Sequence, residues 1–224
     1  TLEFGATAND TRLTTVEDRT TALESSVASL NVAIDIDCTA DADTFINTTI
    51  ADNTTYTLSG MCNGPIELRK KRNVVITGND VTGAKTDGIF LPGGLTTNPY
   101  GALAVWESSA EIRHLTIDAS NYVTDGAGYL YPNPDEFGLG AVEVGQMAIL
   151  RIYDVDIKGG DYGLNVYRQS YAKAYSNVNI TGFNLTGVSA SNAAHVELSQ
   201  PITVIGLLSG STDPSAGAVW AGSN

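Results

Sequence analysis

Apolar and polar residues alternate in short segments that recur along the second half of the chain. The segments His114–Asp118, Asp154–Lys158, Asn177–Thr181 and Pro201–Ile205 carry their apolar residues at equivalent positions. Strict alternation over four to eight residues is the pattern of a strand with one buried face. We therefore expect each segment to be a short β-strand whose apolar side chains face a core.

The spacing of these segments indicates a repeat. Ile157, Ile180 and Val204 are 23 and 24 residues apart. Ile117 precedes Ile157 by 40 residues, and Ile76 precedes Ile117 by 41 residues. We interpret each longer step as one repeat with an inserted loop, which aligns the segment that begins at Asn73 with the one that begins at His114.

A second series of strands recurs with the same period. Gly140–Val144, Tyr162–Val166 and Thr186–Ala190 follow one another at 22 to 24 residues, with Gly101–Val105 before them and Gly217–Trp220 after them. Two or three short strands in each repeat of about 23 residues are typical of a parallel β-helix. Because a left-handed helix of hexapeptide repeats has shorter turns, the pattern predicts an all-β, right-handed parallel β-helix.

One stretch of the chain is similar to a known superfamily. Thr55–Gly60 leads through Ile66–Leu68 to Asn73–Gly78, whose sequence is Asn-Val-Val-Ile-Thr-Gly. This order resembles the N-terminal turns of the pectate-lyase-like superfamily, and the similarity in repeat pattern covers roughly residues 43–220. The resemblance implies the fold, and no active-site motif of a particular enzyme family accompanies it.

The N-terminal residues have a different period. Apolar residues recur every seven positions in two series offset by three, which is the pattern of a coiled-coil helix. The residues of this seam that we expect to mediate assembly are Leu13, Val16, Leu23, Val27, Leu30 and Ile34. We predict a coiled-coil segment in residues 1–35 and the β-helix domain in residues 36–224. A single helix of this length is marginal alone, so it needs either copies of itself or a face of the β-helix.

Charge narrows the choice of partners. Only 17% of the residues are charged, the formal net charge is −13 and the pI is about 4.3. Such a chain repels nucleic acids and anionic membrane surfaces, and it disfavours anionic polysaccharides unless a cation bridges the two. The basic run Arg69–Arg72 is expected to be a solvated corner, and no apolar run is long enough to span a bilayer.

Two cysteines, Cys38 and Cys62, bracket a 23-residue segment. In an oxidising compartment they would form a disulfide that clamps the start of the β-helix, and the alternative is two free buried thiols. Together with the composition, this favours a secreted or cell-surface protein whose leader has been removed.

Stacking the strands in register gathers polar side chains on one face of a sheet. The outward residues there would be His114, Asp118, Asp154, Asp156 and Lys158. An Asp-Val-Asp sequence is also ordinary on a strand whose alternate residues face water. These residues are therefore either a site or a solvated surface.

The resemblance suggests what such a site would do. Lyases of this fold hold Ca²⁺ on clustered aspartates and use a basic residue to remove a proton, whereas hydrolases use paired carboxylates. By position, Asp154 and Asp156 would be the carboxylates, and Arg151, Lys158 or Arg168 the base or clamp. The other catalytic candidate is His114, and the candidate Ca²⁺ ligands are Asp118, Asp154 and Asp156.

The insertion at residues 120–137 is a candidate ligand-binding loop, because long loops on compact repeats often carry function. Aromatic rings beside carboxylates suit sugars. The candidate ligand-binding residues are Tyr122, Tyr129, Tyr131, Asp135, Glu136 and, beside the earlier insertion, Trp106. The alternative is that these loops cover the flank of the β-helix or contact another subunit.

The leading hypothesis is an extracellular structural or adhesive protein that self-associates into oligomers or filaments. The alternatives are a polysaccharide-active enzyme, a lyase before a hydrolase, and a non-catalytic glycan-binding module. The expected partners are copies of the chain and a polysaccharide, and Ca²⁺ is the candidate cofactor.

Overall fold

The computed structural model describes residues 32–79, 83, 85–93, 99–121, 140–199, 201–206 and 217–221, and in the last of these ranges only the side chain of Val219. The internal contacts of the chain divide it into two units, Thr1–Ala33 and Ile34–Asn224. The description below concerns the second unit, together with Val32 and Ala33, with which the first strand begins.

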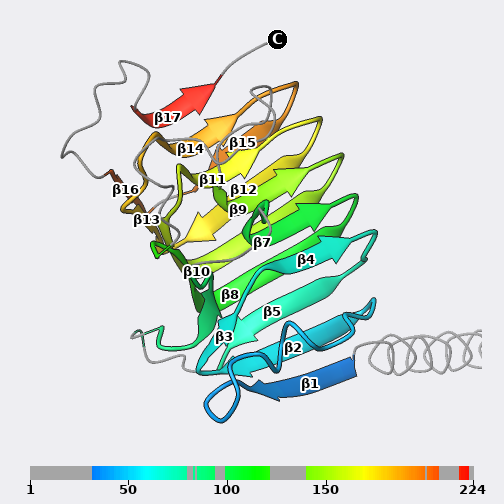
Figure 1. The fold of residues 1–224 in the computed structure, drawn as a ribbon. Helices are drawn as coiled ribbons and strands as arrows, with labels where there is room; N and C mark the ends of the chain where they lie inside the picture. The colour runs from blue at the N-terminus through cyan, green and yellow to red at the C-terminus, as the bar shows by residue number, and fades with distance from the viewer. Residues whose placement is uncertain are drawn as a thin grey trace, which may run out of the picture. The chain divides into compact units, whose positions relative to one another are not determined.

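The described residues form β-strands and turns and no helix (Figure 1). The strands are β1 (Val32–Asp37), β2 (Thr54–Ser59), β3 (Met61–Asn63), β4 (Ile66–Arg69), β5 (Val74–Gly78), β6 (Gly88–Phe90), β7 (Gly101–Trp106), β8 (Ser109–Ala119), β9 (Gly140–Gly145), β10 (Ile149–Gly159), β11 (Tyr162–Val166), β12 (Tyr171–Ser176), β13 (Val178–Thr181), β14 (Thr186–Ala190), β15 (His195–Leu198), β16 (Ile202–Ile205) and β17 (Gly217–Ala221). The prediction of an all-β chain is thereby confirmed for this part.

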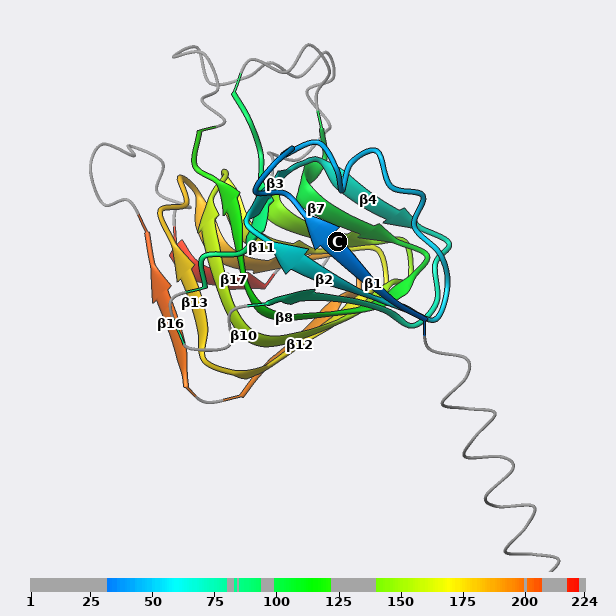
Figure 2. The ribbon, with the colours of Figure 1, turned by 90° about the horizontal axis from the view of Figure 1, so that it is seen from below.

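The strands form two sheets with parallel pairing. In the 11-stranded sheet the main order is β1-β2-β5-β8-β10-β12-β15, and β3, β6, β13 and β16 extend it sideways. The 6-stranded sheet has the order β17-β14-β11-β9-β7-β4. Figure 2 shows β7 and β11 of the smaller sheet lying across from β8, β10 and β12, while β13 and β16 form a third side.

Two long strands turn a corner within the larger sheet. The first half of β10 pairs with β12 and its second half pairs with β13, and β8 divides in the same way between β5 and β6. Between the halves lie His114 with φ 50° and Asp154 with φ 51°, and Asn177 with φ 49° separates β12 from β13. Asn, Asp and His tolerate a positive φ better than most residues, so the sequence places suitable residues at this corner.

The register confirms most of the predicted repeat. Ile117 pairs with Ile157, Ile157 with Ile180, and Ile180 with Val204. In the smaller sheet, the second predicted series forms β7, β9, β11, β14 and β17 in parallel register.

One predicted alignment is wrong. Ile76 pairs with Ile112, and the partner of Ile117 on that side is Ile89. The segment Asn73–Thr77 therefore lies beside the first half of β8 and does not share a column with His114. Both halves of the long strands have the same apolar alternation, so spacing alone could not distinguish them.

The core contains the aliphatic side chains of both sheets. Ile76, Ile112 and Ile152 contribute from the larger sheet, and Leu103 and Val142 from the smaller one, all with no exposed surface. Each fully buried side chain of this kind stabilises the fold by about 1.5–3 kcal/mol relative to exposure. Equivalent apolar positions thus stack on one another in successive strands, and this explains why the register between the strands is well defined.

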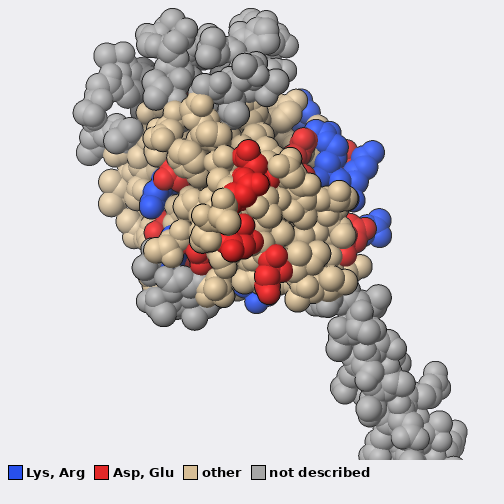
Figure 3. Space-filling model, turned by 60° about the horizontal axis from the view of Figure 1, so that its bottom comes forward, with Lys and Arg blue, Asp and Glu red and all other residues tan. Residues whose placement is uncertain are grey.

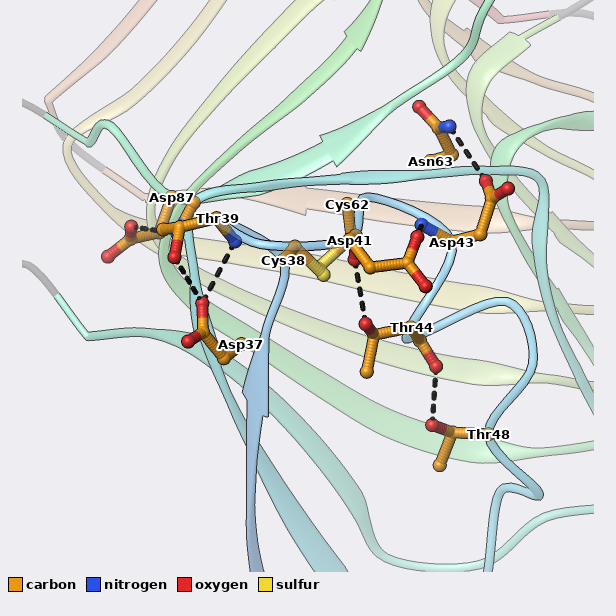
Figure 4. The surroundings of a disulfide bond; sticks show 11 residues. Asp37, Cys38, Thr39, Asp41, Asp43, Thr44, Thr48, Cys62, Asn63 and Asp87 are labelled. Atoms are coloured by element: carbon orange, nitrogen blue, oxygen red, sulfur yellow. Dashed lines mark hydrogen bonds between the residues drawn. A yellow bond between two sulfur atoms is a disulfide. The ribbon is translucent and has the colours of Figure 1, made fainter.

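A disulfide joins Cys38, just after β1, to Cys62 in β3, which confirms the predicted pairing (Figure 4). Both cysteines are buried, and Phe45 between them packs on Tyr56 with ring centroids 5.5 Å apart. The segment that follows Cys38 is held by hydrogen bonds, including one of 2.7 Å from Asn63 Nδ2 to Asp43 Oδ1. The disulfide therefore holds in place the segment that covers this end of the core.

The predicted N-terminal helix needs a correction at its end. Ile34, which the heptad pattern placed on the helical seam, lies in strand β1. Its neighbours Ile36 and Asp37 continue the alternation of a strand, and this local period of two replaces the period of seven. The other seam residues lie outside the described residues: Leu13, Val16, Leu23, Val27 and Leu30. Among the described residues, no helix has the length and apolar character to cross a membrane.

Candidate functional site

A lysine that the sequence pattern did not single out lies at the centre of the acidic cluster. Lys85 Nζ is 3.1 Å from Asp154 Oδ1 and 2.9 Å from Asp156 Oδ1. The Lys85 side chain is only 6% exposed, and those of the two aspartates are 22% and 24% exposed. Nζ also donates to the backbone oxygen of Asn177 at 3.4 Å. One ammonium group thus contacts three oxygens, two from carboxylates of β10 and one from the backbone at the corner between β12 and β13.

The backbone around Lys85 is held against β8 by its own hydrogen bonds. Thr116 Oγ1 donates to the Lys85 carbonyl oxygen at 2.9 Å, and the Thr116 N–H donates to the Asp87 carbonyl oxygen at 2.9 Å. The Asp87 carboxylate accepts from the N–H of Gly60 at 2.7 Å and of Asn79 at 3.0 Å. These bonds place the lysine over the corner although it is 71 residues from Asp156.

Two further side chains contact the carboxylates. His114 Nδ1 lies 2.9 Å from Asp154 Oδ2, and Asn179 Nδ2 donates at 2.8 Å to the same Oδ1 of Asp156 that contacts Lys85. Burial acts to raise the pKa of Asp154, but hydrogen bonds from His114 and Lys85 outweigh it and lower the pKa below its usual 3.8. Asp154 is therefore a firmly ionised carboxylate.

This arrangement limits the chemistry that the cluster can perform. A general acid needs a raised pKa, and that of Asp154 is lowered. A general base needs an accessible lone pair, whereas both oxygens of Asp154 and Oδ1 of Asp156 already contact Lys85, His114 or Asn179.

The residues proposed for Ca²⁺ do not fit a free ion. Asp154 and Asp156 face the ammonium of Lys85, and Asp118 accepts bonds from the N–H and hydroxyl of Ser120 at 2.8 and 2.5 Å. In the described part of the chain, no three or more His, Cys, Asp or Glu side chains are grouped to hold a metal.

The structure separates the other predicted catalytic residues from this cluster. Lys158 pairs in register with Asp118 at the far end of β10. Arg151 lies in the first half of β10, between Glu111 and Lys173. Arg168 is on a turn after β11, 5.7 Å over the ring of Tyr167. Of the predicted set, the cluster therefore brings together His114, Asp154 and Asp156.

A second surface, which we call the tyrosine face, covers the first halves of β8 and β10 together with β12 and β15. Its side chains are Glu111, Arg113, Arg151, Tyr153, Tyr171, Lys173, Tyr175, His195 and Glu197. The rings of Tyr153 and Tyr175 stack with centroids 4.3 Å apart and planes 7° apart. Arg113 lies 6.0 Å over the Tyr153 ring, and Lys173 Nζ lies 4.8 Å over the Tyr175 ring. Adjacent strands thus present alternating aromatic and cationic groups.

The cations of the tyrosine face are not equivalent. Arg113 pairs with Glu111, and Lys173 pairs with Glu197 at 2.6 Å. Among the described residues, exposed Arg151 has no ion-pair partner. In a chain with a net charge of −13, this face carries a guanidinium that pairs with no carboxylate of the described residues and lies beside aromatic groups. The sequence analysis named Arg151 but missed the face, although Tyr171-Ala-Lys-Ala-Tyr175 alternates in the way that predicts it.

Trp106, the described member of the predicted ligand-binding set, is buried in an aromatic cluster. Its ring is 5.1 Å from that of Tyr100 and 5.6 Å from that of Tyr167, both edge-on. Its side chain is almost fully buried, and its Nε1 has no hydrogen-bond partner among the described residues. The other members lie outside the described residues: Tyr122, Tyr129, Tyr131, Asp135 and Glu136.

A buried carboxyl lies in the smaller sheet. Both oxygens of Glu143 accept from Asn165 Nδ2, at 3.2 and 3.0 Å, and Oε1 accepts from the N–H of Gly140 at 2.8 Å. Burial raises the pKa of Glu143 well above its usual 4.5, although these bonds oppose the shift. This side chain is neutral over a wider pH range than a free glutamic acid.

The basic run is solvated as predicted, with Arg69, Lys70 and Arg72 exposed. Arg69 pairs with Glu67 at 2.5 Å, and Lys70 pairs with Glu107 at 3.9 Å. Figure 3 shows basic side chains gathered at one edge and acidic side chains spread across the face that comes forward.

No family model, curated protein or solved structure matches the chain in sequence or fold comparisons.

Proposed function

We propose that this chain is an extracellular adhesive protein folded as a right-handed parallel β-helix, related in architecture to the pectate-lyase-like superfamily. Parallel pairing at steps of 22 to 24 residues in both sheets supports the fold. The Cys38–Cys62 disulfide supports a location outside the reducing cytosol.

The tyrosine face is the proposed binding surface. The observation that carries it is the exposed Arg151 beside the Tyr153–Tyr175 stack, with no ion-pair partner among the residues that the structure describes. In-register strands repeat their outward groups about every 4.8 Å, so an extended polymer can contact several strands in succession. Guanidinium and phenol groups donate hydrogen bonds to sugar hydroxyl and carboxylate oxygens. The partner that fits this surface is an extended glycan.

A non-catalytic role fits the acidic cluster better than the enzymatic alternative. A lyase or hydrolase would need Asp154 or Asp156 free to bind Ca²⁺ or to move a proton. Both carboxylates instead bind the ammonium of Lys85, so the cluster supports the fold at a corner.

Self-association is the second part of the proposal. It rests on the heptad pattern of residues 13–30, because a single helix of this length is marginal alone and copies of itself would supply a partner for its apolar seam. The mass of the full chain in solution tests it: a trimer or larger assembly supports the proposal, and a monomer at every concentration contradicts it.

Glycan binding is tested with the full chain on immobilised dextran and polygalacturonate, one neutral and one acidic. Arg151→Ala is expected to weaken binding at least about tenfold, and Lys158→Ala is the control because it removes one cation from the other half of β10. Loss on polygalacturonate alone would assign Arg151 to acidic groups. Equal binding by both variants and the unmodified chain, or binding to neither polymer, would reject the tyrosine face as this surface.

A further inference from the structure

Beside Arg151, strand β10 exposes apolar side chains that the core does not use. Leu150 and Ile152 belong to the core and have no exposed surface. Ile149, on the opposite side of the strand, is 39% exposed, and Met147, two residues before it, is 67% exposed. A single exposed apolar residue is ordinary, but these two lie next to each other in the chain and next to the guanidinium of the tyrosine face.

The strand register extends this apolar spot into a row across the sheet. Ile149 pairs with Tyr171 of β12, and Tyr171 pairs with His195 of β15. The rings of Tyr171 and His195 are stacked, with centroids 5.5 Å apart and planes 2° apart. Arg151 pairs with Lys173 in the next row of the same face. Because residues two apart on a strand are separated by roughly 7 Å, an apolar and aromatic row runs beside a charged row.

The charges near Arg151 favour a carboxylate although the chain as a whole is acidic. Glu111 on β8 is paired with Arg113, and Glu197 on β15 is paired with Lys173. Arg151 pairs with no carboxylate of the described residues. Salt screens charges beyond about 8 Å at physiological ionic strength, so the local guanidinium outweighs the distant acidic groups.

We propose that the ligand of this surface is an acidic glycan whose sugars also carry acetyl groups. A carboxylate of the glycan would bind Arg151, and an acetyl methyl group would pack on Ile149 and Met147. This ligand class rests on the glycan binding proposed for the tyrosine face and narrows it to one kind of sugar.

The chemistry of the two rows excludes simpler sugars as the best ligand. A guanidinium takes a carboxylate through two parallel hydrogen bonds, which a neutral glycan does not supply. An acidic glycan without acetyl groups would place hydroxyl groups against Ile149, where they find no hydrogen-bond partner in the aliphatic side chain. The methyl of an acetamido or acetyl ester group removes apolar surface from water on both sides of the contact.

The experiment measures binding of the full chain to glycans that carry the two groups separately and together. Hyaluronan and polysialic acid carry carboxylates and acetamido groups, polygalacturonate carries carboxylates alone, and chitin oligosaccharides carry acetamido groups alone. We expect binding to hyaluronan or polysialic acid to be at least about fourfold tighter than to polygalacturonate, which is what burial of one methyl group contributes. Chitin oligosaccharides should bind more weakly than the preferred acidic polymer.

Ile149→Thr keeps a β-branched strand residue and removes the aliphatic surface. It should reduce binding of the preferred polymer to the level of polygalacturonate and leave polygalacturonate binding unchanged. The matched control is Ile205→Thr, which makes the same change at a residue of β16 that is 56% exposed and should alter neither.

The remaining outcomes separate this inference from the proposed function. Equal binding of all the acidic polymers, with loss in Arg151→Ala, would keep the tyrosine face as the binding surface and overturn the acetyl contact. The acetyl contact is also overturned if Ile149→Thr leaves binding of the preferred polymer unchanged, or if Ile205→Thr weakens it equally. Binding to none of the glycans, or binding that Arg151→Ala does not weaken, would reject both.

Discussion

Lys85 Nζ lies 2.9 Å from Oδ1 of Asp156, although the two residues are 71 positions apart in the chain. The contact joins the segment before β6 to the second half of β10, and it does so across β8, which lies between them in the sheet. One side chain therefore ties three neighbouring turns of the repeat together at the corner.

Replacing Lys85 by methionine should destabilise the fold. Breaking a buried ion pair typically costs 3–5 kcal/mol, and the partial exposure of both aspartates reduces this to roughly 2–3 kcal/mol. Urea unfolding at pH 7 measures the change, and Lys158→Met is the matched control with an expected loss below about 0.5 kcal/mol. Equal stability of the two variants would mean that the Lys85 ion pairs contribute nothing.

Asp154 should make the protein sensitive to acid. Its pKa is lowered in the folded state from 3.8, so its contribution is present above pH 3.8 and is lost as the pH falls through the folded pKa. Asp154→Asn should therefore be less stable near neutral pH and should lose less stability between pH 4 and pH 2. The check is urea unfolding across that range, and curves that stay parallel would show that Asp154 does not carry this dependence.

Glu143 should make the stability of the fold depend on pH in the opposite direction. Because burial raises its folded pKa well above 4.5, its contribution is complete below pH 4.5 and is lost as the pH rises through the folded pKa. Glu143→Gln keeps the shape and removes the charge, so it should be more stable than the unmodified protein at alkaline pH.

The measurement for Glu143 is urea unfolding of both proteins from pH 4 to pH 9. The difference between them should grow with pH above 4.5 and then level off. Asn165→Ala is a useful companion, because it removes the hydrogen bonds to both oxygens of Glu143 and should lower stability at every pH. A constant difference between Glu143→Gln and the unmodified protein would show that Glu143 does not titrate in the folded state.

Much of the fold followed from the sequence because a repeat reveals its own register. The step from Ile157 to Ile180 to Val204 predicted direct pairing, and these residues do pair. The alignment of Asn73 with His114 failed because β8 is a single long strand that passes a corner at His114. When the alternation of apolar residues continues past a corner, the sequence pattern is the same before and after that corner.

The candidate site was harder to predict. His114, Asp154 and Asp156 were grouped correctly, since they follow from strand register. Lys85 could not be placed, because it lies outside the repeating strands and its position depends on hydrogen bonds made by Thr116 and Asp87. The position of a side chain on an irregular segment depends on contacts that a periodic sequence pattern does not reveal.

The disulfide should account for a large part of the stability of the first turns of the repeat. Cys38 and Cys62 are separated by 24 positions, and closing a loop of that length restricts the unfolded chain by about 3–4 kcal/mol. We expect Cys38→Ala/Cys62→Ala to lose about this amount in urea unfolding, because the fold around Phe45 and Tyr56 keeps its packing. Reduction of the unmodified protein should give the same loss, and a loss on reduction with none in the double variant would mean that the free thiols, and not the missing cross-link, destabilise the buried site.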